Sequence, residues 1–218
     1  MKKTLSWMFA AILICGTMAS CGGNNDKQQA EEPVVEQAVA PANVLPVYTY
    51  PYEGSVEEGV SRYLIDSLGA FYSPGEVCIP LANVIKMDES DDTDVKVMGD
   101  FWVFNYNLAG DTLKMVSGGS HPGLLHLAKT AEGYAVTAFE QVADGSEFIP
   151  TAKKIFGDMY ESFTKVNGDS ERRNQNLVKV LAEYVQRNQL PVTCYQDYGW
   201  PAVMLFPEQE AVEAAPAE

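Results

Sequence analysis

The chain has 218 residues, of which 46% are hydrophobic and 21% charged, and its 30 acidic and 15 basic side chains give a formal charge of −15. This length and composition predict one globular domain with additional segments. A nucleic acid partner would require a basic face, so the acidic balance argues against nucleic acid binding.

The first twenty residues have the three parts of an export signal. Lys2 and Lys3 supply a basic start, residues 5–18 form an apolar run, and small residues precede Cys21. The apolar run has about 14 residues, fewer than the roughly 20 that a helix needs to cross the hydrocarbon core of a membrane. We therefore expect a cleaved signal peptide over residues 1–20 rather than a membrane span.

The residues Met18-Ala19-Ser20-Cys21 resemble the lipobox of bacterial lipoproteins, in which the cysteine is acylated and becomes the new first residue. This resemblance implies that Cys21 carries fatty acids such as palmitate and that its lipid anchors the chain to a membrane of the cell envelope. An ordinary secretory signal, in which Cys21 is incidental, is the alternative. Without residues 1–20 the chain has 13 basic and 30 acidic side chains, so acyl chains rather than charge must hold it on an anionic membrane.

Two polar segments flank the part that is expected to fold. Residues 21–45 lack aromatic side chains and a sustained apolar period, which predicts the lipidated cysteine followed by a disordered tether. Within them, Gln29-Ala30-Glu31-Glu32 resembles the acidic signals of surface-exported lipoproteins, which implies the outer membrane of a Gram-negative bacterium; a plain solvated linker is the alternative. Residues 207–218 predict an acidic disordered tail. A single domain over residues 46–206 remains, with 22 acidic and 12 basic side chains.

The folded part begins with a helical pattern. Ser55 and Glu58 have the spacing of a capping box, and apolar residues recur at helical spacing up to Gly69, so we expect a helix over residues 56–68. Pro80 lies in the first of several β-type segments that follow and predicts that this segment is an edge strand. The β-type segments, separated by turn-forming residues, are 77–87, 95–106, 112–116, 123–129 and 134–142.

The last part of the domain contains helical patterns followed by short strand-like pieces. Two helices are expected over residues 150–167 and 169–188, and the strand-like pieces are 192–195 and 202–206. This order predicts an α+β domain in which an N-terminal helix lies on a curved antiparallel β-meander, followed by two helices and a short C-terminal strand. A helix on such a meander resembles the cystatin-like and nuclear-transport-factor-like α+β folds.

The segment Ser117-Gly118-Gly119-Ser120-His121-Pro122 is unusually rich in glycine. It resembles a hairpin pattern of small secreted or membrane-anchored bacterial domains, a resemblance that implies no activity. A phosphate-binding loop would end in Gly-Lys-Ser/Thr and precede a helix, and neither condition is met. We therefore expect a turn between two strands.

Two cysteines remain for the folded domain, Cys78 and Cys194. An exported protein meets an oxidising compartment, so a disulfide between them is a candidate, provided that segment 192–195 docks beside the strand at 77–81. Two separately buried thiols are the alternative. A catalytic cysteine is disfavoured, because neither histidine lies near a cysteine in the sequence.

No metal or cofactor is expected. His121 and His126 are five residues apart, so on one strand they face opposite sides and cannot share a metal ion. The acidic segment 88–94 would offer oxygen ligands to calcium, but it lacks the spacing of an EF-hand loop, which favours a solvated turn.

One candidate pocket remains. Asp100, Trp102, Phe104 and Tyr106 share one face of a strand, and in a cone-like fold they would line a pocket together with Tyr63 from the first helix. The alternative is that the aromatic side chains are ordinary core residues and that Asp100 lies in solvent at the mouth of the strand.

Three hypotheses about function follow from these observations, and one of them is a purely structural envelope protein, which would have neither a cavity nor an apolar surface patch. The favoured one is a cell-envelope lipoprotein without enzymatic activity, whose domain binds a protein or a small molecule. The alternative is a small-pocket enzyme of the nuclear-transport-factor-like kind, in which Asp100 is the base and Tyr106 or Tyr63 assists it.

Overall fold

A computed structural model describes residues 45–207 of the chain. The predicted signal peptide, Cys21, nearly all of the tether and the tail from residue 208 onward lie outside the described residues, so lipidation and surface location stay predictions. No helix within residues 45–207 is both long and apolar enough to span a membrane.

The N-terminal helix forms at the capping box. Helix α1 spans Val56–Tyr63, and Ser55 Oγ accepts a hydrogen bond from the backbone N–H of Glu58 at 3.1 Å. The Glu58 carboxylate accepts from the N–H of Gly54, one residue earlier than the spacing predicts. The helical path continues through a π-helical turn at Leu64–Leu68 and a 3-10 turn at Gly69–Phe71, so Gly69 does not end it.

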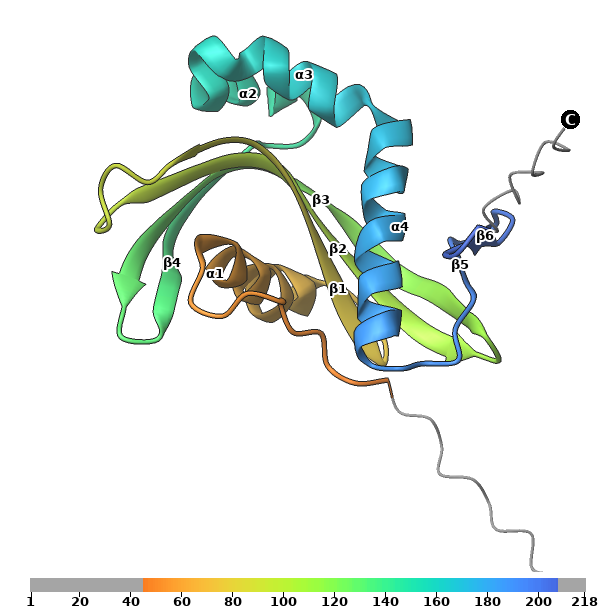
Figure 1. The fold of residues 1–218 in the computed structure, drawn as a ribbon. Helices are drawn as coiled ribbons and strands as arrows, with labels where there is room; N and C mark the ends of the chain where they lie inside the picture. The colour runs from red at the N-terminus through yellow and green to blue at the C-terminus, as the bar shows by residue number, and fades with distance from the viewer. Residues whose placement is uncertain (1–44, 208–218) are drawn as a thin grey trace, which may run out of the picture. The chain divides into compact units, whose positions relative to one another are not determined.

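A curled β-sheet forms the centre of the domain (Figure 1). Each of its first three strands pairs antiparallel with the next, and β1 lies at an edge, as Pro80 predicts. Two short strands extend the sheet, with β5 parallel to the start of β3 and β6 antiparallel to β5. The strands are β1 (Val77–Asp88), β2 (Val95–Ala109), β3 (Thr112–Thr130), β4 (Gly133–Gln141), β5 (Cys194–Gln196) and β6 (Val203–Met204).

The glycine-rich segment is not a turn, which corrects the expectation from sequence. Residues 117–122 lie inside β3 and pair with β2 without interruption. Glycine is required here by close packing, because a Cβ atom on Gly118 would collide with the carbonyl oxygen of Val103, and one on Gly119 with the hydroxyl of Tyr72. The local sequence of residues 117–122 favours a turn, but their pairing and contacts across the sheet stabilise a strand.

Three helices follow the first four strands. They are α2 (Phe148–Phe156), α3 (Tyr160–Gly168) and α4 (Ser170–Arg187). The sequence pattern predicts one helix over residues 150–167, but Gly157 adopts a positive φ of 50° and a 3-10 turn at Gly157–Met159 separates α2 from α3.

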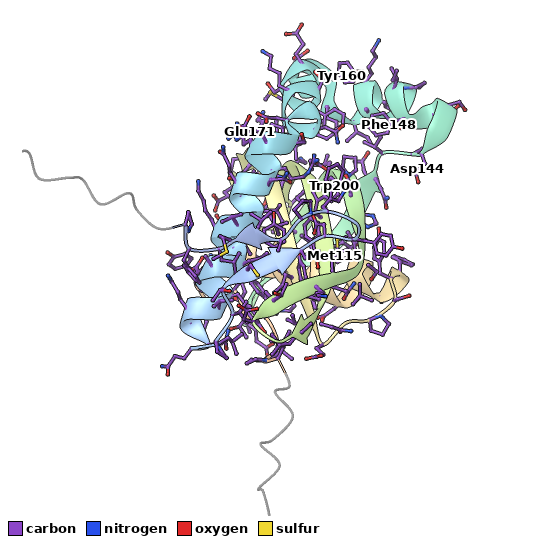
Figure 2. The ribbon with its side chains drawn as sticks, turned by 90° about the vertical axis from the view of Figure 1, so that its right-hand side faces the viewer. Met115, Asp144, Phe148, Tyr160, Glu171 and Trp200 are labelled. Atoms are coloured by element: carbon purple, nitrogen blue, oxygen red, sulfur yellow. The ribbon has the colours of Figure 1, made fainter. Side chains whose placement is uncertain are left out.

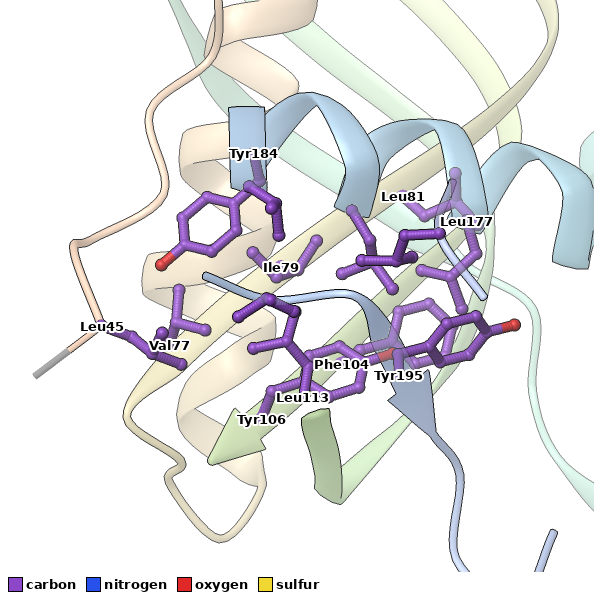
Figure 3. Packing of buried hydrophobic residues seen from close by; sticks show 14 residues of the cluster. Leu45, Val77, Ile79, Leu81, Phe104, Tyr106, Leu113, Leu177, Tyr184 and Tyr195 are labelled. Carbon is purple, nitrogen blue, oxygen red and sulfur yellow. The ribbon is translucent and has the colours of Figure 1, made fainter. Parts of the chain in front are cut away.

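The two faces of the sheet bury separate cores. Odd-numbered residues of β2, such as Phe101 and Val103, pack with α1. Even-numbered residues, such as Phe104 and Tyr106, pack with α4, as Figure 3 shows, while Met98 packs with α2 and α3. These features confirm the α+β class with a curled, mainly antiparallel sheet.

Candidate functional site

Three of the five predicted pocket residues form a row of stacked rings on β2. The ring centroids of Trp102 and Phe104 lie 5.7 Å apart with an angle of 6° between the planes, and those of Phe104 and Tyr106 lie 6.4 Å apart at 28°. All three rings belong to the core beneath α4. They share one face of the strand, as period-2 spacing predicts.

Tyr63 does not join this row. Its ring meets that of Phe139 edge-on, with centroids 6.1 Å apart, in the core on the α1 side of the sheet. The sheet therefore separates Tyr63 from Trp102, Phe104 and Tyr106. The five residues do not line a common pocket between the first helix and the sheet, which corrects that expectation.

Asp100 is completely buried, with an exposed fraction of 0%, and so does not lie in solvent at the mouth of the strand. One carboxylate oxygen accepts a hydrogen bond from Nε1 of Trp102 at 2.9 Å, and the other accepts from Oγ of Ser120 at 2.7 Å. Burial raises the pKa of Asp100, while these two donors and the nearby Arg173 partly offset that rise. Both oxygens are engaged in holding neighbouring side chains.

Arg173 connects α4 to the row of rings. Its guanidinium carbon lies 4.6 Å from the centroid of the Trp102 ring, which is a cation–π contact. Nη1 of the same side chain donates to the carbonyl oxygen of Asn167 at 3.4 Å. Its charge also lowers the pKa of Asp100, so the buried carboxylate has a positive charge nearby.

An open groove lies above this arrangement, between α4, strands β2 and β3, and the loop that follows β5. Its volume is about 290 Å³. We call it the aromatic groove, and Figure 2 labels Met115 and Trp200 in it. The groove is lined by Trp102, Phe104, Met115, Arg173, Asn174, Leu177, Asp197, Tyr198 and Trp200.

The outer wall of the groove consists of aromatic side chains in the loop that follows β5. Tyr198 is 93% exposed and Trp200 is 72% exposed. Gly199 between them has a φ of 76°, and the N–H of Trp200 donates to the carbonyl oxygen of Asp197 at 3.1 Å, which makes this segment a tight turn. Two large aromatic residues in one turn are the signal that could have pointed to this site, since turns usually carry small or polar residues.

Two buried oxygen atoms near the groove have no hydrogen-bond partner among residues 45–207. They are Oδ1 of Asp197, which lines the groove, and the hydroxyl oxygen of Tyr106. Burial raises the pKa of Asp197, and both burial and the Asp197 charge raise that of Tyr106. Tyr106 thus remains neutral at neutral pH, and Oδ1 of Asp197 is a buried acceptor without a donor among the described residues.

The candidate disulfide is absent, because Cys78 and Cys194 are both free thiols. Cys78 lies on β1 and Cys194 on β5, with β2 and β3 between those strands. The sulfur of Cys194 contacts Oγ1 of Thr112 at 3.1 Å instead. Burial and the charge of Asp66 raise the pKa of Cys78 to about 11, which makes it an unreactive thiol.

The two histidines lie on opposite faces of β3 and have separate partners. Nε2 of His121 lies 2.9 Å from the Tyr72 hydroxyl in the α1-side core. His126 lies on the other face, where its ring nitrogens contact Asp94 at 2.7 Å and Glu140 at 3.1 Å. No cluster of three or more His, Cys, Asp or Glu side chains suited to a metal occurs in the described range.

Comparison of the chain with protein-family models, with curated proteins and with solved structures finds no match. The function must therefore be inferred from the chemistry of the aromatic groove itself.

Proposed function

We propose that this protein is a lipid-anchored binding protein of the bacterial cell envelope and that it holds its ligand in the aromatic groove. The export signal and the lipobox ending at Cys21 support the anchor. The groove supports binding, because it is a concave, mainly apolar site with a few polar groups, as ligand sites usually are.

The observation that carries the proposal is the exposure of Trp200 and Tyr198 beside the stacked rings of Trp102 and Phe104. A folded domain normally covers such large apolar side chains, and aromatic patches left open mark interaction sites. Tryptophan, tyrosine and arginine are also the residues that contribute most to binding energy in interfaces. All three residue types line this one groove.

The geometry favours binding over the alternative of an enzyme with Asp100 as base. Both oxygens of Asp100 already accept hydrogen bonds, and its carboxylate is not among the groups that line the groove. Tyr63 lies on the other face of the sheet.

For the fold we keep the finer proposal that α1 on the curled meander resembles the cystatin-like and nuclear-transport-factor-like folds.

Tryptophan side chains in the groove provide signals that report on binding. The chain contains three tryptophans, and the two outside the predicted signal peptide, Trp102 and Trp200, both line the groove. Screening the mature chain against a library of small aromatic, aliphatic and peptide fragments should shift both indole N–H resonances together. Trp200→Ala should weaken any such binding about tenfold or more, while Phe71→Ala, which removes a similarly exposed ring elsewhere, should not. Fragments that bind without moving either indole signal would place the binding site elsewhere.

The anchor has an independent test. Cys21→Ser should abolish acylation, so the variant should leave the membrane fraction or accumulate with its signal peptide uncleaved. Mass spectrometry of the wild-type chain should find acyl groups on Cys21. An unmodified Cys21 thiol in envelope-derived protein would refute the anchor and leave the groove proposal intact.

A further inference from the structure

The outer edge of β3 is only partly covered. Strand β5 pairs with it at residues 112–114, and β4 pairs with it at residues 123–130. Between these two stretches, over residues 115–121, no described strand pairs with this edge. The open stretch contains seven residues, long enough to accept a short added strand.

The backbone along this stretch offers hydrogen-bonding groups. The carbonyl oxygen of Pro122 points outward, because it accepts from the N–H of Val142 at 2.9 Å. The backbone N–H and C=O of a residue in an antiparallel strand point to the same side, and this side repeats every second residue. The N–H and C=O groups of Ser120 and of Gly118 therefore also face the open edge. These two residues are partly exposed rather than buried.

Apart from a β-bulge at Val116, where the pairing with β2 shifts register, this edge lacks the usual protections against strand addition. Natural sheet edges are commonly blocked by charged side chains, especially lysine, or by proline. The open stretch from Met115 to His121 contains no lysine and no proline, and two of its residues are glycines without a side chain. An extended chain can therefore approach the backbone closely.

The open edge adjoins the aromatic groove. Trp102 is the pairing partner of Ser120, and Phe104 is that of Gly118, and both rings face the groove. A strand added to β3 would direct every second side chain to that face of the sheet, over the groove. Asp197 also lines the groove and brings a negative charge to it, while the positive charge of Arg173 is offset by Asp100.

We infer that the ligand of the aromatic groove is an extended basic peptide segment of another protein, which pairs with the open edge of β3 and lays a lysine or arginine side chain across the rings toward Asp197. The inference rests on the proposed function and names its partner class. Aromatic faces attract cations and hold their aliphatic stems. The excess of 22 acidic over 12 basic side chains in residues 46–206 also favours encounter with a basic partner.

The first experiment selects nonapeptides from a random display library on the mature chain, purified in detergent. Selected peptides should be rich in β-branched residues and contain a lysine or arginine. Their affinity should fall about tenfold or more in Ser120→Pro, which removes the outward N–H, relative to Ser120→Ala. The alanine variant is the matched control, because both variants lose the hydrogen bond from Ser120 to Asp100 but alanine keeps its backbone donor.

A second measurement needs no variant and covers the case in which Ser120→Pro does not fold. Amide hydrogen exchange at Gly118 and Ser120 should slow at least tenfold when the selected peptide is bound.

A third measurement tests the charge at the groove. Asp197→Asn, which retains the shape of the side chain, should weaken binding about tenfold and reduce the dependence of the affinity on salt.

The outcomes separate this inference from the proposed function. Indole shifts without slower exchange at Gly118 and Ser120 would leave groove binding standing and overturn strand pairing. Selection of acidic or neutral peptides would overturn the basic partner. A dimer in sedimentation that Ser120→Pro dissociates, with no peptide selected, would show that a second copy of the chain occupies the edge, and would refute the inference. No effect on either indole signal from any peptide or fragment would overturn the proposed function itself.

Discussion

The two faces of the sheet differ in how completely they are covered. On the α1 side, Val97, Phe101 and Val103 are fully buried beneath the helix. On the other side, α4 covers Phe104 and Tyr106, but Trp102 remains at the floor of an open groove. Neighbouring residues of one strand thus differ in burial, because a helix closes one face and the other face carries the groove that we propose as the binding site.

The largest effect is expected on the closed face. Phe101→Ala removes a fully buried ring from the α1-side core and should lower the free energy of unfolding by about 3–5 kcal/mol. The matched control is Phe71→Ala, whose ring is 79% exposed and whose loss should stay within about 0.5 kcal/mol. Urea denaturation measures both. A loss below about 1 kcal/mol for Phe101→Ala would contradict the description of this face as a tightly packed core.

A somewhat smaller effect is expected at the buried carboxylate beneath the groove. Asp100→Ala leaves the Trp102 indole N–H and the Ser120 hydroxyl without their acceptor and removes the charge near Arg173. We expect a loss of about 2–4 kcal/mol in the free energy of unfolding. Asp100→Asn retains one acceptor oxygen and should lose less. Equal stability of the wild type and Asp100→Ala would show that this network is dispensable.

The two histidines should give opposite responses to pH, one on each face. Burial lowers the pKa of His121 below its usual value of 6.5, so its contribution to stability is lost as pH falls below that value. The Asp94 and Glu140 carboxylates raise the pKa of His126, so its contribution is present below pH 6.5 and is lost as pH rises through the raised pKa.

Single variants separate these two responses. His121→Gln should reduce the loss of stability on the acid side, and His126→Gln should remove the decline on the alkaline side. The His126 effect should be at most about 1 kcal/mol, because its partners Asp94 and Glu140 are 40% and 52% exposed. Denaturation curves recorded between pH 5 and 8 test both, and identical pH profiles for the two variants would refute the assignment.

The smallest effect on stability is expected at the rim of the groove. Trp200→Ala should change the free energy of unfolding by no more than about 0.5 kcal/mol, because the ring is mostly exposed. The same variant should weaken binding in the proposed groove about tenfold or more, so it tests binding separately from stability. A loss of stability above about 2 kcal/mol would instead make Trp200 part of the core.

Local signals in the sequence predict part of the fold correctly. The capping box at Ser55 places α1, and Pro80 places β1 at an edge, because both effects depend on a few neighbouring residues. The turn predicted at the glycine-rich segment of β3 is wrong. Only pairing with β2 and contact with Tyr72 explain why glycine is needed inside that strand.

The sequence by itself determined which residues share a face. Alternation along a strand is a property of the backbone, so the spacing of Trp102, Phe104 and Tyr106 is enough to group them. Only the tertiary structure decided which face of the sheet each helix covers, and hence that Asp100 is buried while Trp200 and Tyr198 remain exposed. Burial depends on chain segments distant in sequence, and here α4 and the loop after β5 create the groove around residues that lie about 60 to 100 positions earlier in the chain.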